Sequence, residues 1–94
     1  MAMSEVERRR LRAMLSSADW EDLTPRLLAV AQYRLSQYGR TVGRHGTTPD
    51  QFVIRAVMDV LEGKYEPVLI RSLFGVIAPR IAILVHLDDR HHIM

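Results

Sequence analysis

The stretch TPDQFVIRAVMDVLEG, residues 48–63, carries the clearest helical pattern in the chain. It opens with Thr48 as an N-cap and with Pro49 at the first helical position, where the missing amide hydrogen costs nothing. Gln51 stands at the capping-box position, and Gly63 is suited to stop the helix. The apolar residues recur at helical spacing and form one stripe: Phe52, Val53, Ala56, Val57, Val60 and Leu61. This pattern predicts an amphipathic helix that buries one face.

A second helix is expected between Thr24 and Gly39. Thr24 followed by Pro25 gives the same start signal, and Gly39 can take the left-handed conformation that ends a helix. Its inward residues lie three and four apart: Leu27, Leu28, Ala31, Leu35 and Tyr38. Trp20, just upstream, is expected to cover the bottom of the core.

The last helix is expected to open at Pro67. Its inward face consists of Leu69, Ile70, Leu73, Phe74, Ile77, Ile81, Leu84 and Val85. Pro79 lies inside this pattern and removes the amide that would bond the carbonyl of Gly75, which predicts a kink and not a stop. The apolar residues off this face are Val76, Ala82 and Ile83. A helix apolar nearly all round is expected to be central in the bundle or covered by another surface.

A weaker helix leads the chain. Ser4 and Glu7 have the spacing of a capping box, so a helix is expected from Glu5 to about Ser16. Its apolar residues are sparse, which predicts loose packing or fraying. The sequence therefore predicts an all-α fold, a small three- to four-helix bundle. Its expected parts are an N-terminal helix or arm over 1–19, a helical domain over 20–87 and a polar tail over 88–94.

Composition limits the class of protein. The 94 residues suffice for one small domain, and 48% hydrophobic with 26% charged residues is typical of a soluble globular chain. The absence of cysteine excludes disulfides and thiol catalysis. The longest apolar stretch, 75–87, is interrupted by Pro79 and Arg80 and is too short to span a bilayer. A cytoplasmic protein is expected.

Three segments together resemble a known family. They are WEDLTPRLLAVA at 20–31, TPDQFV at 48–53 with the apolar stripe and the Leu-Glu-Gly turn that follow it, and LFGVI at 73–77. In order and spacing they resemble domain two (region 2) of extracytoplasmic-function sigma factors of the sigma-70 family. The resemblance implies that the middle helix docks on the coiled-coil clamp of RNA polymerase. It also implies that the long last helix and the loop before it recognise and open the −10 promoter element through aromatic and basic residues.

Several positions depart from the family pattern. Ile54 and Arg55 stand where the family helix usually has a Gln-acid pair, and Ala78 and Pro79 stand where the long helix usually has Arg-Asn or Arg-Ser. Tyr65 is the one loop aromatic residue available for a flipped base. We expect the protein to lack the domain that would read the −35 element. A divergent stand-alone module is therefore expected, and not a complete promoter-specific initiation factor.

A candidate protein interface lies on the middle helix. Ile54 and Met58 stand four residues apart, away from the core stripe, and charged residues flank them, as in interfaces with an apolar centre and a polar rim. The predicted partner-binding residues are Ile54, Arg55, Met58, Asp59 and Glu62, and the predicted partner is the RNA polymerase core or another protein. Isolated surface hydrophobes are also common without any function, so that alternative stays open.

A second candidate surface would make weak DNA contacts. The predicted residues are Arg40, Arg44, Lys64, Tyr65 and Arg71, with Tyr65 as a stacking ring and His45 nearby. The alternative is a solvated basic rim on a chain of net charge +2. The arginines of residues 8–12 likewise form either a flexible phosphate-binding arm or the exposed face of a frayed helix.

Catalysis and metal binding find little support in the sequence. His86, His91 and His92 lack a third ligand at helical spacing, so a solvated tail is favoured over a metal site. There is no Gly-rich phosphate loop, no nucleophile elbow and no pair of carboxylates on an apolar face. We expect no enzyme activity and no cofactor.

The sequence thus favours a sigma-factor-like helical binding module. We expect a transcription-related regulator that contacts RNA polymerase, promoter DNA or both. The alternative is a homo-oligomeric structural or adaptor domain that keeps the fold without transcription activity. In that case Val76 and Ile83 would lie in the self-interface, because a two-fold axis pairs a patch with itself.

Overall fold

Four α-helices form the part of the chain, residues 4–64 and 72–90, that the computed structural model describes. They are α1 (Glu5–Ser17), α2 (Trp20–Ser36), α3 (Pro49–Leu61) and α4 (Leu73–Arg90). No strand occurs in these two ranges. The prediction of an all-α fold and a small helical bundle is confirmed.

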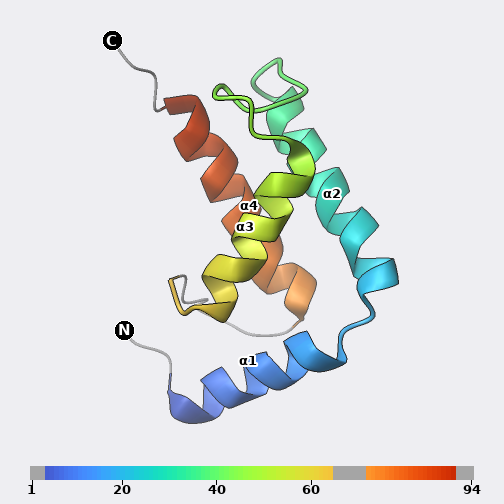
Figure 1. The fold of residues 1–94 in the computed structure, drawn as a ribbon, viewed down its shortest axis with the longest axis vertical. Helices are drawn as coiled ribbons and strands as arrows, with labels where there is room; N and C mark the ends of the chain where they lie inside the picture. The colour runs from blue at the N-terminus through green and yellow to red at the C-terminus, as the bar shows by residue number, and fades with distance from the viewer. Residues whose placement is uncertain (1–3, 65–71, 91–94) are drawn as a thin grey trace.

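Three of the helices pack pairwise into one unit. α3 runs in the direction opposite to α2 and α4; in Figure 1 it crosses in front of α4, and α2 lies to its right. α1 crosses the end of this unit at which α3 ends and α4 begins (Figure 1). The loop between α2 and α3 lies at the other end, beside the last turns of α4.

The core is continuous across all four helices and is aliphatic apart from Phe52. Its fully buried large side chains are Leu27, Leu35, Val76, Ile77, Ile81 and Val85. Leu11 and Leu15 of α1 belong to the same cluster, so this helix contributes to the core. The capping box of Ser4 and Glu7 is present, and α1 extends to Ser17.

The sequence pattern of α3 is largely confirmed. Thr48 precedes the helix, and its backbone amide donates to Gln51 Oε1 at 2.9 Å. Gly63 follows the helix with φ of 75°, the left-handed conformation expected of a terminating glycine. The buried residues of the predicted stripe are Phe52, Val53, Ala56 and Val60. Leu61, expected in the core, is 45% exposed instead.

α2 begins earlier than predicted. Its N-cap is Asp19, and Thr24 and Pro25 lie inside the helix. Pro25 removes the amide that would bond the carbonyl of Glu21, which is one lost hydrogen bond close to the helix start. Starting at Trp20 adds a turn that buries Leu23. At the other end the helix stops at Ser36, and Gly39 closes the turn with φ of 71°.

α4 begins later than predicted. The predicted helix was expected to include Ser72, which is not helical and directly precedes α4. Pro67, Leu69 and Ile70, also part of that prediction, lie outside the described residues. The hydroxyl of Ser72 accepts a hydrogen bond from the backbone amide of Gly75 at 3.0 Å, as at an N-cap. The helix continues through Pro79 as predicted.

The C-terminal end of α4 also differs from the prediction. Residues 88–90, expected to start a polar tail, form the last turn of the helix, which ends at Arg90. Carboxylates at a helix C-terminus face the negative end of the helix dipole, which is unfavourable. Asp88 and Asp89 offset this cost by binding the loop between α2 and α3.

Candidate functional site

The outer face of α3 carries three large apolar side chains. Ile54 is 60% exposed, Met58 44% and Leu61 45%. They lie four and three residues apart, so they occupy one side of the helix, opposite the buried Ala56 and Val60. We name Ile54, Met58 and Leu61 the α3 stripe. Leu61, predicted in the core, belongs to this side because its distance of seven residues from Ile54 is two helical turns.

The charged residues around the α3 stripe divide into two groups. Arg55 and Glu62 are exposed, as their predicted place at an interface requires. Asp59 is only 7% exposed, and its Oδ2 accepts hydrogen bonds from Arg80 Nε at 3.0 Å and Nη2 at 2.9 Å. The prediction that Asp59 binds a partner is therefore wrong, because this carboxylate is used inside the protein to join α3 to α4.

A second apolar surface lies between α2 and α4. It is a groove of about 830 Å³, and it is lined by Arg26, Ala29, Val30, Tyr33, Arg34, Phe74, Gly75, Ala78, Pro79, Ala82 and Ile83. We name it the α2/α4 groove. Its sides include small residues such as Ala29, Ala78 and Ala82, and none of the described residues that line it is acidic.

Two arginines mark the α2 side of this groove. The guanidinium of Arg26 lies 4.6 Å from the centre of the Phe74 ring, a cation–π distance, and it also pairs with Asp22 at 3.5 Å. Arg34 Nη1 donates to Gln37 Oε1 at 3.3 Å. Both arginines are exposed. No local sequence pattern indicates this groove, because α2 and α4 are far apart in the chain.

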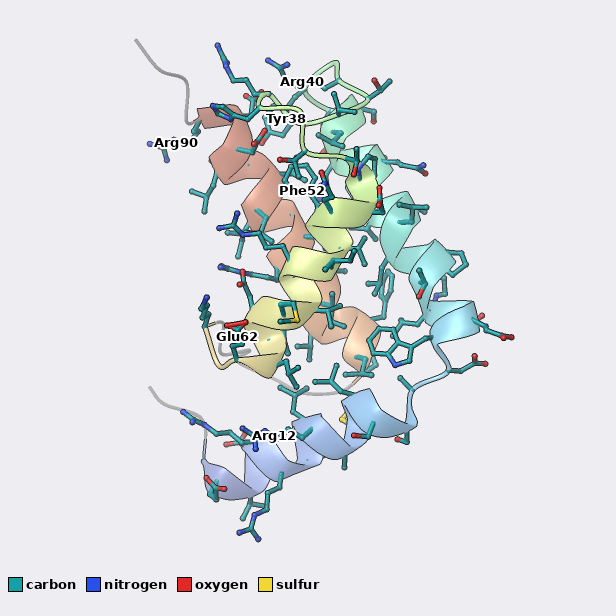
Figure 2. The ribbon with its side chains drawn as sticks, in the orientation of Figure 1. Arg12, Tyr38, Arg40, Phe52, Glu62 and Arg90 are labelled. Carbon is teal, nitrogen blue, oxygen red and sulfur yellow. The ribbon has the colours of Figure 1, made fainter. Side chains whose placement is uncertain are left out.

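The predicted DNA-contacting residues do not form one patch. Arg40 and Arg44 belong to the loop before α3, whereas Lys64 follows the other end of that helix, about 20 Å away at 1.5 Å per residue. Figure 2 labels Arg40 and Glu62 at these two ends. Tyr65 and Arg71 lie outside the described residues.

The loop arginines and His45 also contact α4. Arg40 Nε donates to Asp89 Oδ1 at 3.2 Å, and the backbone amide of Arg44 donates to Asp88 Oδ2 at 2.6 Å. His45 Nδ1 lies 3.3 Å from Asp88 Oδ1. Asp89 thus pairs with the charge of Arg40, while Asp88 binds the loop backbone at Arg44, and two carboxylates lie where phosphate contacts were expected. This weakens the case for DNA binding at this end.

Two further predictions concern α4. Val76 is fully buried, so the prediction that it lies in a self-interface is wrong, while Ile83 is 39% exposed at the α2/α4 groove. His86 contacts Tyr38, whose Oη lies 2.7 Å from His86 Nδ1, and His91 and His92 lie outside the described residues. Within residues 4–64 and 72–90 no group of three or more His, Cys, Asp or Glu could hold a metal ion.

None of the described helices is both long and apolar enough to cross a bilayer.

Comparison of the chain with protein-family models, with curated proteins and with solved structures found no match.

Proposed function

We propose that the chain is a sigma-factor-like, protein-binding module that contacts the RNA polymerase core through the α3 stripe. The observation that carries this proposal is the exposure of three large apolar side chains on one side of α3, at positions opposite the core. In a monomeric protein, the side of a surface helix that faces solvent normally carries polar residues. Arg55 and Glu62 add the polar rim of an interface.

The choice of RNA polymerase as partner depends on the sequence resemblance. In extracytoplasmic-function sigma factors the helix that corresponds to 48–63 docks on the polymerase clamp. The outward position of Ile54 and Met58 on α3 is compatible with such docking. Ile54 replaces a polar family residue, which makes the centre of the proposed contact more apolar.

The test measures the affinity of the purified chain for core RNA polymerase by biolayer interferometry. The variant Ile54→Glu/Met58→Glu is expected to weaken binding about tenfold or more, because it places two charges at the centre of the contact. The matched control is Val6→Glu/Val42→Glu, which makes the same chemical change at exposed positions on α1 and on the loop. Control binding is expected to equal that of the unmodified chain.

Two results would overturn the proposal. One is no binding by the unmodified chain under conditions in which an intact sigma factor binds. The other is an equal loss of binding in the α3 variant and in the control.

A homo-oligomeric adaptor is the second candidate function. It depends on Ile83, the residue of the predicted self-interface that is exposed. Light scattering at tens of micromolar protein tests it. A dimer that Ile83→Glu converts to a monomer would support this role, and a monomeric unmodified chain would exclude it.

A further inference from the structure

The α2/α4 groove has the dimensions of a site for one helix. Arg26 and Arg34 are eight residues apart on α2, and Gly75 and Ile83 are eight apart on α4, so each side extends about 12 Å. That length matches about two turns of a helix. Small side chains on both sides allow the backbone of a third helix to approach closely.

The charges of the groove determine what kind of helix fits. Among the described residues, Arg26 and Arg34 are the charged ones that line it, both lie exposed on the α2 side, and Arg26 also pairs with Asp22 of the same helix. An amphipathic helix with an apolar stripe and acidic residues seven or eight apart would bury the stripe between α2 and α4. Its carboxylates would then meet these two arginines.

We propose that the α2/α4 groove binds an acidic amphipathic helix of a partner protein. This surface is separate from the α3 stripe, since no residue of α3 lines the groove. The chain would then have two protein-binding faces, one for each partner.

Two other occupants fit the groove less well. A second copy would offer two more arginines and no carboxylate from its own described groove residues to meet Arg26 and Arg34. Single-stranded DNA would find aromatic rings in Tyr33 and Phe74 but only two cations for its phosphates, on a surface that is otherwise apolar.

The test uses two synthetic stapled helices labelled with a fluorophore. Both carry leucines at positions i, i+3, i+4 and i+7, and the charged flanking positions are glutamate in one peptide and lysine in the other. Fluorescence anisotropy measures their affinity for the full chain. The glutamate peptide is expected to bind about tenfold more tightly than the lysine peptide, and the difference is expected to shrink as salt is raised.

Variants locate the binding site. Arg26→Glu/Arg34→Glu is expected to reverse the preference between the two peptides. The control Arg10→Glu/Arg90→Glu changes the net charge equally at exposed positions that do not line the groove, and it is expected to keep the preference. Ile83→Glu is a second groove variant at an exposed position and is expected to weaken binding of the glutamate peptide about tenfold. Ile54→Glu is expected to leave that binding unchanged, which separates this proposal from the one for the α3 stripe.

The outcomes that overturn the proposal are specific. Equal affinity for the two peptides, or a preference unchanged in Arg26→Glu/Arg34→Glu, would exclude an acidic helix as the occupant. Tighter binding of labelled oligothymidylate, lost in the same variant, would assign the groove to single-stranded DNA. A dimer in light scattering that Ile83→Glu dissociates would assign it to a second copy.

Discussion

Asp59 is the one charged residue that is buried among the described residues. A buried carboxylate is tolerated when it is paired and hydrogen-bonded, and both conditions are met by the guanidinium of Arg80. The two side chains are 10% and 19% exposed, so solvent screens the pair only weakly. The pair therefore joins α3 to α4 in a defined register.

We expect Asp59→Ala to lower the free energy of unfolding by about 3 kcal/mol, because it removes both charge-assisted hydrogen bonds that join Arg80 to α3. Urea unfolding followed by circular dichroism measures this loss. Glu62→Ala, an exposed acidic residue three positions later, is the control and should change stability by less than about 0.5 kcal/mol. Equal effects of the two substitutions would contradict the role assigned to Asp59.

Gly43 is a buried loop residue at the contact with α4. A Cβ atom there would lie 2.7 Å from Asp88 Oδ2 and 3.0 Å from Phe52 Cζ. The carboxylate would have to move away from the amide of Arg44. We therefore expect Gly43→Ala to cost about 1–3 kcal/mol of unfolding free energy.

A double-mutant cycle checks this cause. In an Asp88→Ala background the closest contact of the new methyl group is gone, so Gly43→Ala should cost less than it does in the unmodified chain. The same cost in both backgrounds would show that Asp88 is not what excludes a side chain at Gly43.

At the level of the helices, prolines in different positions have opposite consequences. Pro49 is at the first position of α3, where its fixed φ favours the helix and its missing amide costs no hydrogen bond. Pro79 is in the interior of α4, where it removes the amide that would bond the carbonyl of Gly75. Replacing these two prolines is therefore expected to change the free energy of unfolding in opposite directions.

We expect Pro79→Ala to raise the free energy of unfolding by about 1 kcal/mol or more, because it supplies the missing hydrogen bond. Pro49→Ala should lower it by about 0.5–1 kcal/mol through the greater entropy of the unfolded chain. Thermal unfolding of the two variants gives both signs. A destabilising Pro79→Ala would contradict the assignment of a lost hydrogen bond as the main effect of this proline.

Local sequence patterns predict some helix boundaries correctly and others not. The start of α3 was predictable because Thr48, Pro49 and Gln51 all point to the same position. The same rule failed at Thr24 and Pro25, because burial of Leu23 and capping by Asp19 extend α2 by a turn. A Thr-Pro pair is a local signal, whereas the gain from burying Leu23 depends on the whole core.

The candidate surfaces were predictable only in part. Ile54 and Met58 are four residues apart, so helical periodicity alone placed them on the outer side of α3. Asp59 and Arg80 are 21 residues apart, and Arg44 and Asp88 are 44 apart. No local pattern indicates such pairs, so neither the predicted role of Asp59 in partner binding nor that of Arg44 in DNA binding took account of these contacts with α4.

For the whole molecule, the question is whether α1 is part of the folded unit. Its apolar residues are few, but Leu11 is 2% exposed and Leu15 8%, and both pack in the common core. Trp20 at the start of α2 donates its indole N–H to the carbonyl of Leu15 at 3.2 Å, which fixes the junction between the two helices.

We expect Leu11→Ala to lower the free energy of unfolding by about 2–3 kcal/mol and to do so in a single cooperative transition, because the cavity lies in the common core. Val6→Ala, at a position that is 76% exposed on the same helix, is the control and should have almost no effect. If Leu11→Ala leaves stability unchanged, α1 is a frayed arm.

The most direct test of the proposed function is photo-crosslinking of the whole chain to core RNA polymerase. Benzoylphenylalanine is placed at Ile54 on the α3 stripe, at Ile83 on the α2/α4 groove or at Val6 on α1, all exposed positions. We predict a crosslink to a polymerase subunit from position 54 and none from position 6. A crosslink from position 83 alone, or equal yields from all three positions, would contradict polymerase binding through α3.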